Sequence, residues 1–272
     1  MGDDAVQRTS DWMAVVRDDE HRRADAYLRD PYAQLLRTGA AEEQVAYQIG
    51  LGAPVGVVVG RGRFGDAAVE RGVAAGVRQL VLLGAGSDTR CWRLALPSDL
   101  TAYEVDLPGQ LAVKESAFKA AGLGPSAPRR RVDADLRGDW AAALAAAGHD
   151  AGSPTVWIAE GLFYYLDRGD SIELLSEIGR LSAAGSRVVF DVPHPAFARD
   201  PAKSAFLAYM TESGCPWLGF AEHPDVLLPL GAWRLDAYLP PDLVAGRCPW
   251  LPPLPQRLAD SHRWVWYAHA RR

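Results

Sequence analysis

The sequence predicts an α/β fold in which a mainly parallel sheet is covered by helices on both faces. Three observations indicate this fold: short apolar segments alternate with helical stretches, the first apolar segment runs into a glycine turn, and the second ends in acids. In sheets of this kind, ligands bind at the carboxyl ends of the strands, where the strand order reverses. We therefore expect a ligand site at that end of the sheet.

The expected elements follow one another along the chain. Residues 10–60 have helical spacing, with turn signals at Asp30-Pro31 and Ala53-Pro54. Expected strands are apolar runs bounded by turn residues, at 79–83, 101–105, 129–133, 154–159 and 186–191. Expected helices lie between them at 108–121, 140–147 and 170–181. The tail at 263–270 is apolar or alternating, which predicts a last strand.

The chain divides into four segments of what we expect to be one domain, 1–272. Residues 10–75 form a helical N-terminal cap, and 76–192 form the core of alternating strands and helices. Residues 193–255 are rich in Pro, Trp and Tyr and have weaker periodicity, which predicts a lid or substrate wall. Residues 256–272 contain the final strand.

The glycine turn after the first strand reads Gly84-Ala85-Gly86-Ser87-Asp88-Thr89. Glycine has no Cβ, so the backbone can approach a ligand closely, and Ser or Asp can cap the following helix. A dinucleotide fingerprint would have a third glycine where Thr89 stands. Its absence argues against NAD and favours a cofactor without phosphates, for which S-adenosyl-L-methionine is the obvious candidate. A turn without any ligand is the alternative.

Composition narrows the class of protein. The net charge is -5, and this acidic balance gives no indication that the protein binds nucleic acid or an anionic membrane. No apolar run approaches the roughly 20 residues of a membrane span, and the acidic start, Met1 to Asp4, is unlike a signal peptide. The 3 cysteines are widely spaced and form no C-x-x-C pair, which is typical of reduced thiols without zinc. We expect a cytoplasmic enzyme without a metal.

Several blocks of the sequence, taken in order, resemble the leucine carboxyl methyltransferase family, which includes bacterial polyketide O-methyltransferases. The blocks are Gly76 to Arg90, Tyr103 to Pro108, Asp135 to Arg137, Trp157 to Leu162, and Tyr165-Leu166. Upstream, 17–20 and 30–33 resemble the N-terminal helices of the family, and Arg61 to Phe64 occupies the place of its arginine motif. The resemblance spans residues 10–192.

The resemblance implies a class I methyltransferase: a Rossmann-like, seven-stranded, mainly parallel sheet with N-terminal helices and a lid insertion after the fifth strand. It also implies S-adenosyl-L-methionine as the cofactor and O-methyl transfer to a small-molecule acceptor. The leading hypothesis is a carboxylate acceptor, such as an aromatic polyketide acid or another secondary metabolite. Three alternatives remain: a phenolic hydroxyl, the C-terminal carboxyl of a protein, and a cofactor-binding protein without catalysis.

Within this family pattern, residues of the core would hold the nucleoside. The backbone of Gly84-Ala85-Gly86 would approach the methionine part of the cofactor. Asp106 is the first candidate for the ribose and Glu104 the second, because a carboxylate accepts both hydrogen bonds of a diol. Asp135 and Leu136 would face the adenine, the carboxylate accepting from the exocyclic amine. The alternative for Asp135 is a helix N-cap.

Charged residues would hold the amino-acid part of the cofactor. Glu160, which precedes Gly161 after an apolar strand, needs a positive or hydrogen-bonding partner there, so it is expected to bind the ammonium. The alternative is an ion pair with an arginine of the N-terminal helices. For the cofactor's carboxylate, Arg61 matches the family position best, Arg17 comes next, and Arg63 is a further candidate.

No residue stands out as a catalytic base. A carboxylate acceptor is already nucleophilic at neutral pH, whereas a phenol would benefit from a base. His194 and His223 lie in the 193–255 segment, where either could serve, although each precedes a proline and could simply be a turn residue. Tyr165 could line the methyl-transfer cleft. Arg90 could reach the site or pair with Asp88.

Overall fold

The computed structural model describes residues 3–229 and 231–272, with side chains described from Trp12 onward. Met1 and Gly2, part of the acidic start, lie outside the described residues. The described chain forms a seven-stranded sheet in the order β3-β2-β1-β4-β5-β7-β6. The strands are β1 (Gln79–Leu83), β2 (Thr101–Asp106), β3 (Arg129–Asp133), β4 (Thr155–Ala159), β5 (Arg187–Pro193), β6 (Arg234–Tyr238) and β7 (Val265–Arg271).

Strand order and direction confirm the mainly parallel sheet that the sequence predicts. β1 pairs in parallel with both β2 and β4, so the strand order reverses at β1. β7 is antiparallel to both of its neighbours, β5 and β6. Because a parallel sheet carries all its connections on its faces, helices must cover both of them.

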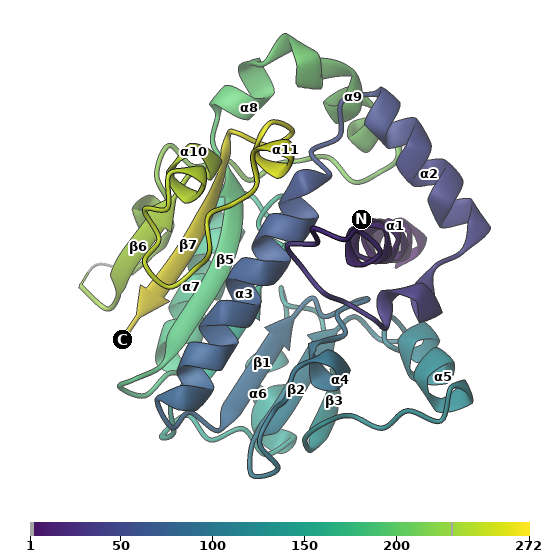
Figure 1. The fold of residues 1–272 in the computed structure, drawn as a ribbon. Coiled ribbons are helices and arrows are strands. Elements are labelled where there is room, and N and C mark those ends of the chain that lie inside the picture. Colours follow the sequence, from purple (N-terminus) through teal and green to yellow (C-terminus); the bar gives the residue numbers. More distant parts are fainter. Residues whose placement is uncertain (1–2, 230) are drawn as a thin grey trace.

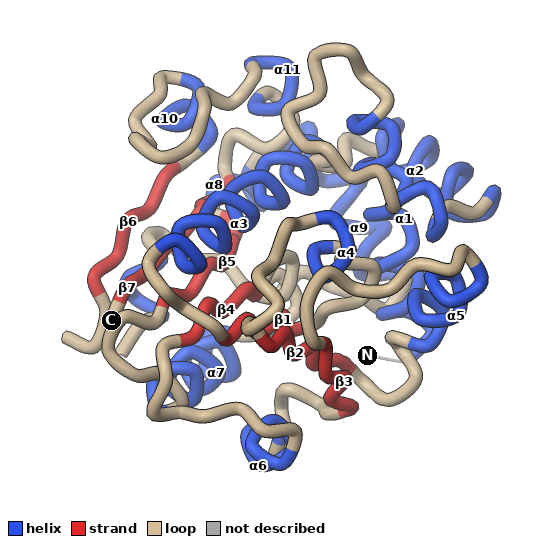
Figure 2. The backbone as a smooth tube through the Cα atoms, turned by 60° about the horizontal axis from the view of Figure 1, so that its bottom comes forward, coloured by secondary structure: helices blue, strands red, loops and turns tan. Residues whose placement is uncertain are grey.

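The central strands are buried on both faces. Leu80 and Leu82 of β1 belong to one hydrophobic cluster, while Val81 and Leu83 belong to the other. This alternation follows from the two-residue period of a strand. Figure 2 shows α3 (Gly56–Ala74) on one side of the strands and α6 (Trp140–Ala146) and α7 (Arg168–Arg180) on the other. An apolar run with no polar alternation is therefore what this sheet requires.

The N-terminal cap consists of three long helices and a short 3-10 turn. They are α1 (Asp3–His21), η1 (Ala33–Leu36), α2 (Gly39–Gly50) and α3. The turn signal at Ala53-Pro54 precedes α3, which continues beyond the expected helical region. The remaining core helices are α4 (Arg90–Arg93) and α5 (Ala112–Ala120). Among the described helices, we find none that is both long and apolar enough to cross a membrane.

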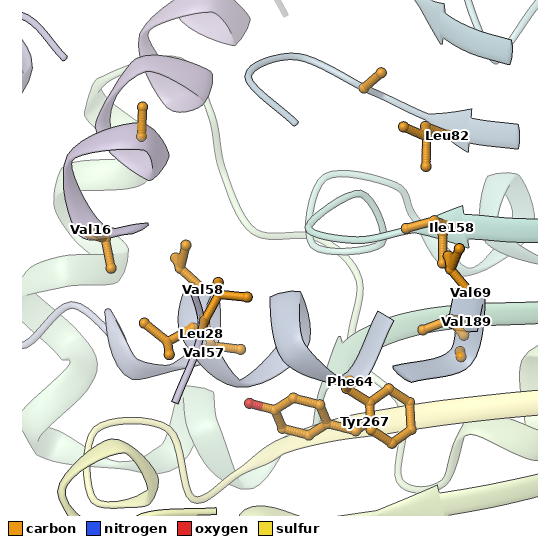
Figure 3. Close-up of a cluster of buried hydrophobic side chains, with 14 of the residues drawn as sticks. Val16, Leu28, Val57, Val58, Phe64, Val69, Leu82, Ile158, Val189 and Tyr267 are labelled. Carbon is orange, nitrogen blue, oxygen red and sulfur yellow. The ribbon is translucent and has the colours of Figure 1, made fainter. Parts of the chain in front are cut away.

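Helix α3 lies between α1 and the sheet, as Figure 1 shows. In Figure 3, Val58 of α3 lies near Val16 of α1, whereas Val69 lies near Ile158 of β4. The close approach depends on glycines: a Cβ at Gly60 would overlap the hydroxyl of Tyr267. Tight packing against the sheet brings the polar residues of α3 to the carboxyl ends of the strands.

The 193–255 segment differs from the expected lid in one respect, because it also supplies a strand. It contains α8 (Ala196–Arg199), η2 (Pro201–Lys203), α9 (Ser204–Glu212), η3 (Pro224–Leu227), β6 and α10 (Pro240–Val244), and α11 (Gln256–Ala259) follows. The sequence does not reveal β6 because Arg234–Tyr238 is a short edge strand with charged residues and pairs only with β7. Among the described residues of this segment, those that line the cavity described below lie within 214–218: Gly214, Pro216 and Leu218.

Candidate functional site

A cavity of about 470 Å³ lies at the carboxyl ends of β1, β2 and β4. It coincides with the reversal of strand order, where open α/β sheets bind their ligands, and its volume suits a small molecule. The predicted site residues that line it are Arg17, Arg61, Gly84, Ala85, Gly86, Asp106, Asp135, Leu136, Glu160, Gly161 and Tyr165. Arg63, Glu104, His194 and His223 are not among the residues that line it.

The glycine turn and Asp106 are joined by backbone hydrogen bonds. Gly84 and Gly86 have φ angles of 63° and 34°, which a residue with a Cβ rarely adopts. The Gly86 N–H donates to Asp106 Oδ2 at 2.7 Å, and the Leu107 N–H donates to Oδ1 at 2.8 Å. Burial raises the pKa of Asp106, although both N–H groups oppose the rise. Asp106 is therefore held firmly at the end of β2.

Glu104 lies two residues earlier on β2 and has different partners. It is fully buried, and its Oε1 accepts from Lys114 Nζ of α5 at 2.9 Å. Its Oε2 accepts from Arg129 Nε of β3 at 2.9 Å. Because two cations inside the protein already neutralise this carboxylate, the structure gives Glu104 a structural position and leaves Asp106 as the acid that faces the cavity.

Glu160 follows β4 and forms an ion pair with Arg90. Arg90 Nη2 donates to Glu160 Oε1 at 2.6 Å, so the partner comes from α4 and not from the N-terminal helices. Burial raises the pKa of Glu160 to about 7, and the positive charges of Arg90 and Arg61 only partly offset this rise. A cationic ligand would thus favour the ionised form of a carboxylate that is otherwise easily protonated.

Arg61 and Gly161 are organised by an acid that sequence reasoning missed. Asp191 of β5 accepts from Arg61 Nη1 at 3.3 Å and from the Gly161 N–H at 2.7 Å. The Tyr164 hydroxyl donates to the same carboxylate at 2.5 Å. A Cβ at Gly161 would lie 2.7 Å from the terminal nitrogens of Arg61, so glycine gives the guanidinium its place. Like Asp106 and Glu160, Asp191 directly follows an apolar run, here Val188 to Phe190 on β5, and this was the available signal.

The other two arginine candidates lie in different surroundings. Arg17 Nη2 donates to the Ser87 carbonyl oxygen at 2.6 Å, and Arg17 Nε donates to Asp30 Oδ2 at 2.9 Å. These bonds fasten α1 over the glycine turn. Arg63 instead pairs with Glu70 at 3.4 Å, outside the cavity. The physical reason is that two residues along a helix turn the side chain by about 200°, away from the face that Arg61 occupies.

Asp135 and Leu136 line the cavity beyond the end of β3. The carboxylate of Asp135 accepts from the Arg137 N–H and from Arg137 Nη2, each at 2.9 Å. The N-cap that was the alternative for Asp135 belongs to Asp139, whose side chain accepts from the Ala142 N–H. Asp135 thus remains available to the cavity, with an arginine beside it.

The three catalytic candidates separate clearly. Tyr165 lines the cavity, and burial raises its pKa to about 12. His194 accepts from the Ala196 N–H at 3.0 Å and lies 2.9 Å from Glu222. His223 caps η3. Both histidines lie outside the cavity, in the alternative role given above, because a short helix begins at the proline that follows each of them.

Arg90 and Asp88 also line the cavity, and part of the remaining wall comes from distant parts of the chain that gave no local signal. Met13 and Val58 approach from the N-terminal cap, and Pro216 and Leu218 from the segment after α9. These residues are ordinary apolar side chains in the sequence. Only packing brings them together, so no sequence pattern could have assigned them to the site.

Comparisons with known proteins agree with this geometry. The sequence matches the family model of leucine carboxyl methyltransferase over residues 11–179. A relative from Mycobacteroides abscessus, named as an S-adenosyl-L-methionine-dependent methyltransferase, is 43% identical over 201 residues, 69% of this chain and 65% of the relative. The alignment thus spans slightly less than two thirds of that protein. A relative of the same name from Streptomyces coelicolor is 42% identical over 67% of this chain and 68% of its own length.

Solved structures share the fold at low identity. A structure from Thermobifida fusca, named as a methyltransferase, superposes with a TM-score of 0.60, 17% identity, and coverage of 95% of this chain and 94% of that chain. A protein of the duf574 family from Streptomyces avermitilis superposes with a TM-score of 0.61, 14% identity, and coverage of 95% and 96%. The strand order and these neighbours show a class I methyltransferase fold. With its family match covering more than half of its length, the chain belongs to the leucine carboxyl methyltransferase family.

Proposed function

We propose that this protein is an S-adenosyl-L-methionine-dependent O-methyltransferase whose acceptor is the carboxylate of a small molecule. The observation that carries the proposal is one cavity that brings the glycine turn, the acids Asp106 and Glu160, and the arginines Arg17 and Arg61 to the point where the strand order reverses. The family match and the names of the two relatives support the cofactor and the type of reaction.

The residues of the cavity fit the chemical groups of this cofactor. Asp106 offers carboxylate oxygens to a ribose diol, and Glu160 offers a carboxylate to the ammonium. Arg17 and Arg61 offer guanidinium groups to the cofactor's carboxylate. The cofactor, when bound, supplies a methyl group on a sulfonium for displacement by a nucleophile. The protein's part is to align the reactants and to keep water away from them.

The apolar wall that remains for the acceptor favours an apolar carboxylic acid, and we propose an aromatic polyketide acid or another secondary metabolite of that kind. Met13, Val58, Pro216 and Leu218 give this wall its apolar character, and we propose residues 214–218 as the part of the lid that contacts the acceptor. Among the described residues, no histidine lines the cavity. The pKa of Tyr165, about 12, keeps its hydroxyl protonated at neutral pH. A carboxylate acceptor suits these surroundings because it needs no base.

A phenolic hydroxyl is the second candidate acceptor. It is favoured by Glu160, because a carboxyl with a pKa of about 7 is suited to accept a proton at neutral pH. In that case Glu160 would act on the acceptor and could not also serve the ammonium. The two candidates therefore make different demands on the same residue.

A transfer assay separates the candidates. The protein is incubated with methyl-labelled cofactor and, separately, with aromatic carboxylic acids, phenols, and peptides with a free C-terminal carboxyl. Products are then treated with mild alkali, which releases methanol from a methyl ester but leaves an aryl ether intact. We expect alkali-labile label on small carboxylic acids. Label on phenols or peptides would replace the proposed acceptor, and cofactor binding without transfer to any acceptor would indicate a non-catalytic protein.

The assay needs a variant that separates transfer from non-specific labelling. Asp106→Asn keeps an oxygen that can accept from a backbone N–H but loses the charge at the ribose end of the cavity. It should lower labelling in proportion to its loss of cofactor affinity. If the wild-type protein fails to bind S-adenosyl-L-methionine in calorimetry, the proposed function is wrong.

A further inference from the structure

Arg90 is a buried cation whose function the reaction itself does not explain. We propose that Arg90, packed against Gly65 of α3, is a positioning residue that holds the carboxylate of Glu160 at the cavity and keeps it ionised for a cationic ligand. The inference rests on the proposed function for the identity of that ligand. It concerns how the protein prepares Glu160, and it can be tested on the protein by itself.

The guanidinium of Arg90 is held by acceptors from three parts of the fold. Its Nε donates to Asp66 Oδ1 at 2.8 Å, and its Nη1 donates to Asp88 Oδ2 at 2.5 Å. Its Nη2 donates both to the Gly62 carbonyl oxygen at 2.8 Å and to Glu160 Oε1 at 2.6 Å. These contacts engage four of the five N–H donors of a rigid planar group. Arg90 also lines the cavity, but only one of its donors is left for a ligand, so we assign it to act through Glu160.

Gly65 provides the space in which Arg90 and Glu160 meet. It lies inside α3, where glycine is about 1 kcal/mol less favourable than alanine in a helix. A Cβ at this position would overlap Glu160 Oε1 and would lie 2.6 Å from Arg90 Nη2. The absence of a side chain at Gly65 is thus needed for the ion pair to lie against the helix.

The charges around Glu160 explain why a fixed cation is needed there. Arg90 and Arg61 stabilise the ionised carboxylate, whereas Asp88 and Asp191 and, above all, burial destabilise it. Arg90 is the cation in direct contact with Glu160, and it is only 1% exposed. If Arg90 were lost, two negative neighbours and burial would oppose Arg61 alone. Glu160 would then be protonated at neutral pH and would attract an ammonium poorly.

The test compares two ligands that differ only at the amino-acid end. S-adenosylhomocysteine carries an ammonium and a carboxylate, and 5′-methylthioadenosine carries neither. In Arg90→Met, we expect affinity for S-adenosylhomocysteine at pH 7.5 to fall by roughly tenfold or more, while affinity for 5′-methylthioadenosine stays within about twofold. The midpoint of the pH dependence of S-adenosylhomocysteine binding should rise by about 1–3 pH units. Arg90→Lys keeps the charge, so the midpoint of its pH dependence should lie close to that of the wild type.

Matched controls separate positioning from a general loss of stability. Arg129→Met removes a partner of Glu104 outside the cavity and should lower the melting temperature without moving the midpoint. Gly65→Ala should lower the affinity for S-adenosylhomocysteine but leave the affinity for 5′-methylthioadenosine nearly unchanged. Gly72→Ala on the same helix, whose Cβ would meet Val156 in the core, should only destabilise the protein. If Arg90→Met does not fold, Gly65→Ala carries the same comparison between the two ligands.

A measurement without ligand distinguishes failure of this inference from failure of the proposed function. Carbon-13 NMR of the Glu160 carboxyl follows its titration directly, and in Arg90→Met or Gly65→Ala the titration should move to higher pH. An unmoved titration, or equal weakening of both ligands, would overturn the positioning function of Arg90. A moved titration in a protein that binds neither ligand would support the inference and reject the proposed cofactor.

Discussion

The two ends of the cavity each hold an acid, and they hold it in different ways. At the end of β2, Asp106 is fixed by two backbone N–H groups, those of Gly86 and Leu107. After β4, Glu160 is fixed by the side chain of Arg90. Burial raises the pKa of both carboxyl groups. The first arrangement depends on backbone that the glycine turn already provides, and the second depends on a long side chain that must itself be held in place.

The consequence is that the Glu160 end is coupled to the rest of the fold. Arg90 shares Asp66 with Arg93, whose Nη2 lies 2.7 Å from Asp66 Oδ1. Arg93 in turn lies 3.8 Å from Asp30, which also accepts from Arg17 of α1. A chain of ion pairs thus joins this end of the cavity to the N-terminal cap. A substitution at the Glu160 end should therefore disturb more distant contacts, as far as the N-terminal cap, than a substitution of Asp106 does.

The largest effect should come from the buried acid that lies outside the cavity. Glu104→Gln leaves Lys114 and Arg129 without their shared anion and should lower the free energy of unfolding by about 3–5 kcal/mol. Cofactor affinity should stay unchanged where the variant is folded. Urea unfolding and calorimetry measure the two quantities. A loss of cofactor affinity without a loss of stability would indicate that Glu104 binds the ribose.

At the β2 end, Asp106→Ala should cost the most cofactor affinity. It removes an acceptor of the ribose hydroxyls and also frees the Gly86 N–H that fixes the glycine turn. We expect a loss near the upper end of the roughly 1.5–3 kcal/mol typical of hydrogen bonds to charged groups. Isothermal titration with S-adenosyl-L-methionine measures it. Unchanged affinity would remove Asp106 from the site.

At the β4 end, Glu160→Gln should lower cofactor affinity more than it lowers stability. The amide keeps an oxygen for Arg90 but offers no charge to an ammonium, so we expect a loss of about 1.5–2 kcal/mol. Arg90 retains Asp66 and Asp88, which limits the effect on unfolding. Calorimetry and thermal melting should be run on the same samples. A variant that melts far lower than the wild type but binds normally would make Glu160 purely structural.

The pH dependence should distinguish the two ends further. Without cofactor, Glu160 takes up a proton as the pH falls through about 7, whereas a bound ammonium favours the ionised form. Cofactor affinity should therefore fall below pH 7, by up to about tenfold per pH unit, and level off above it. Because the pKa is raised in the folded state, the contribution of Glu160 to stability decreases as the pH rises from about 4.5 to 7. Glu160→Gln should abolish the affinity trend, and its persistence there would assign the titration to another group.

The smallest effects should come from the two histidines of the 193–255 segment. His194→Ala and His223→Ala remove turn hydrogen bonds outside the cavity, so methyl transfer and cofactor affinity should each stay within about twofold, or roughly 0.4 kcal/mol. Single-turnover transfer on both variants measures this. A tenfold loss of transfer at unchanged affinity would show that this part of the lid reaches the acceptor.

The strands show how far local patterns go in predicting this fold. β1 and β3 have the predicted bounds, while β2, β4 and β5 differ from the predicted ranges by one or two residues. These strands can be recognised in the sequence as apolar runs because both faces of the sheet are buried. β6 was not located, because an edge strand with partly exposed side chains needs no such run. Its position is fixed by pairing with β7.

By itself, the sequence determined the glycine turn, the acid at the end of β2 and the likeness to one family. These features rest on neighbours along the chain, since a glycine's backbone freedom and a strand's end are local properties. The tertiary structure decided the rest: Arg90 meets Glu160 across 70 residues, and Asp191 meets Arg61 across 130. Such contacts depend on how α3, α4 and the strands pack, because a long side chain finds its partner only after the elements that carry both are in place.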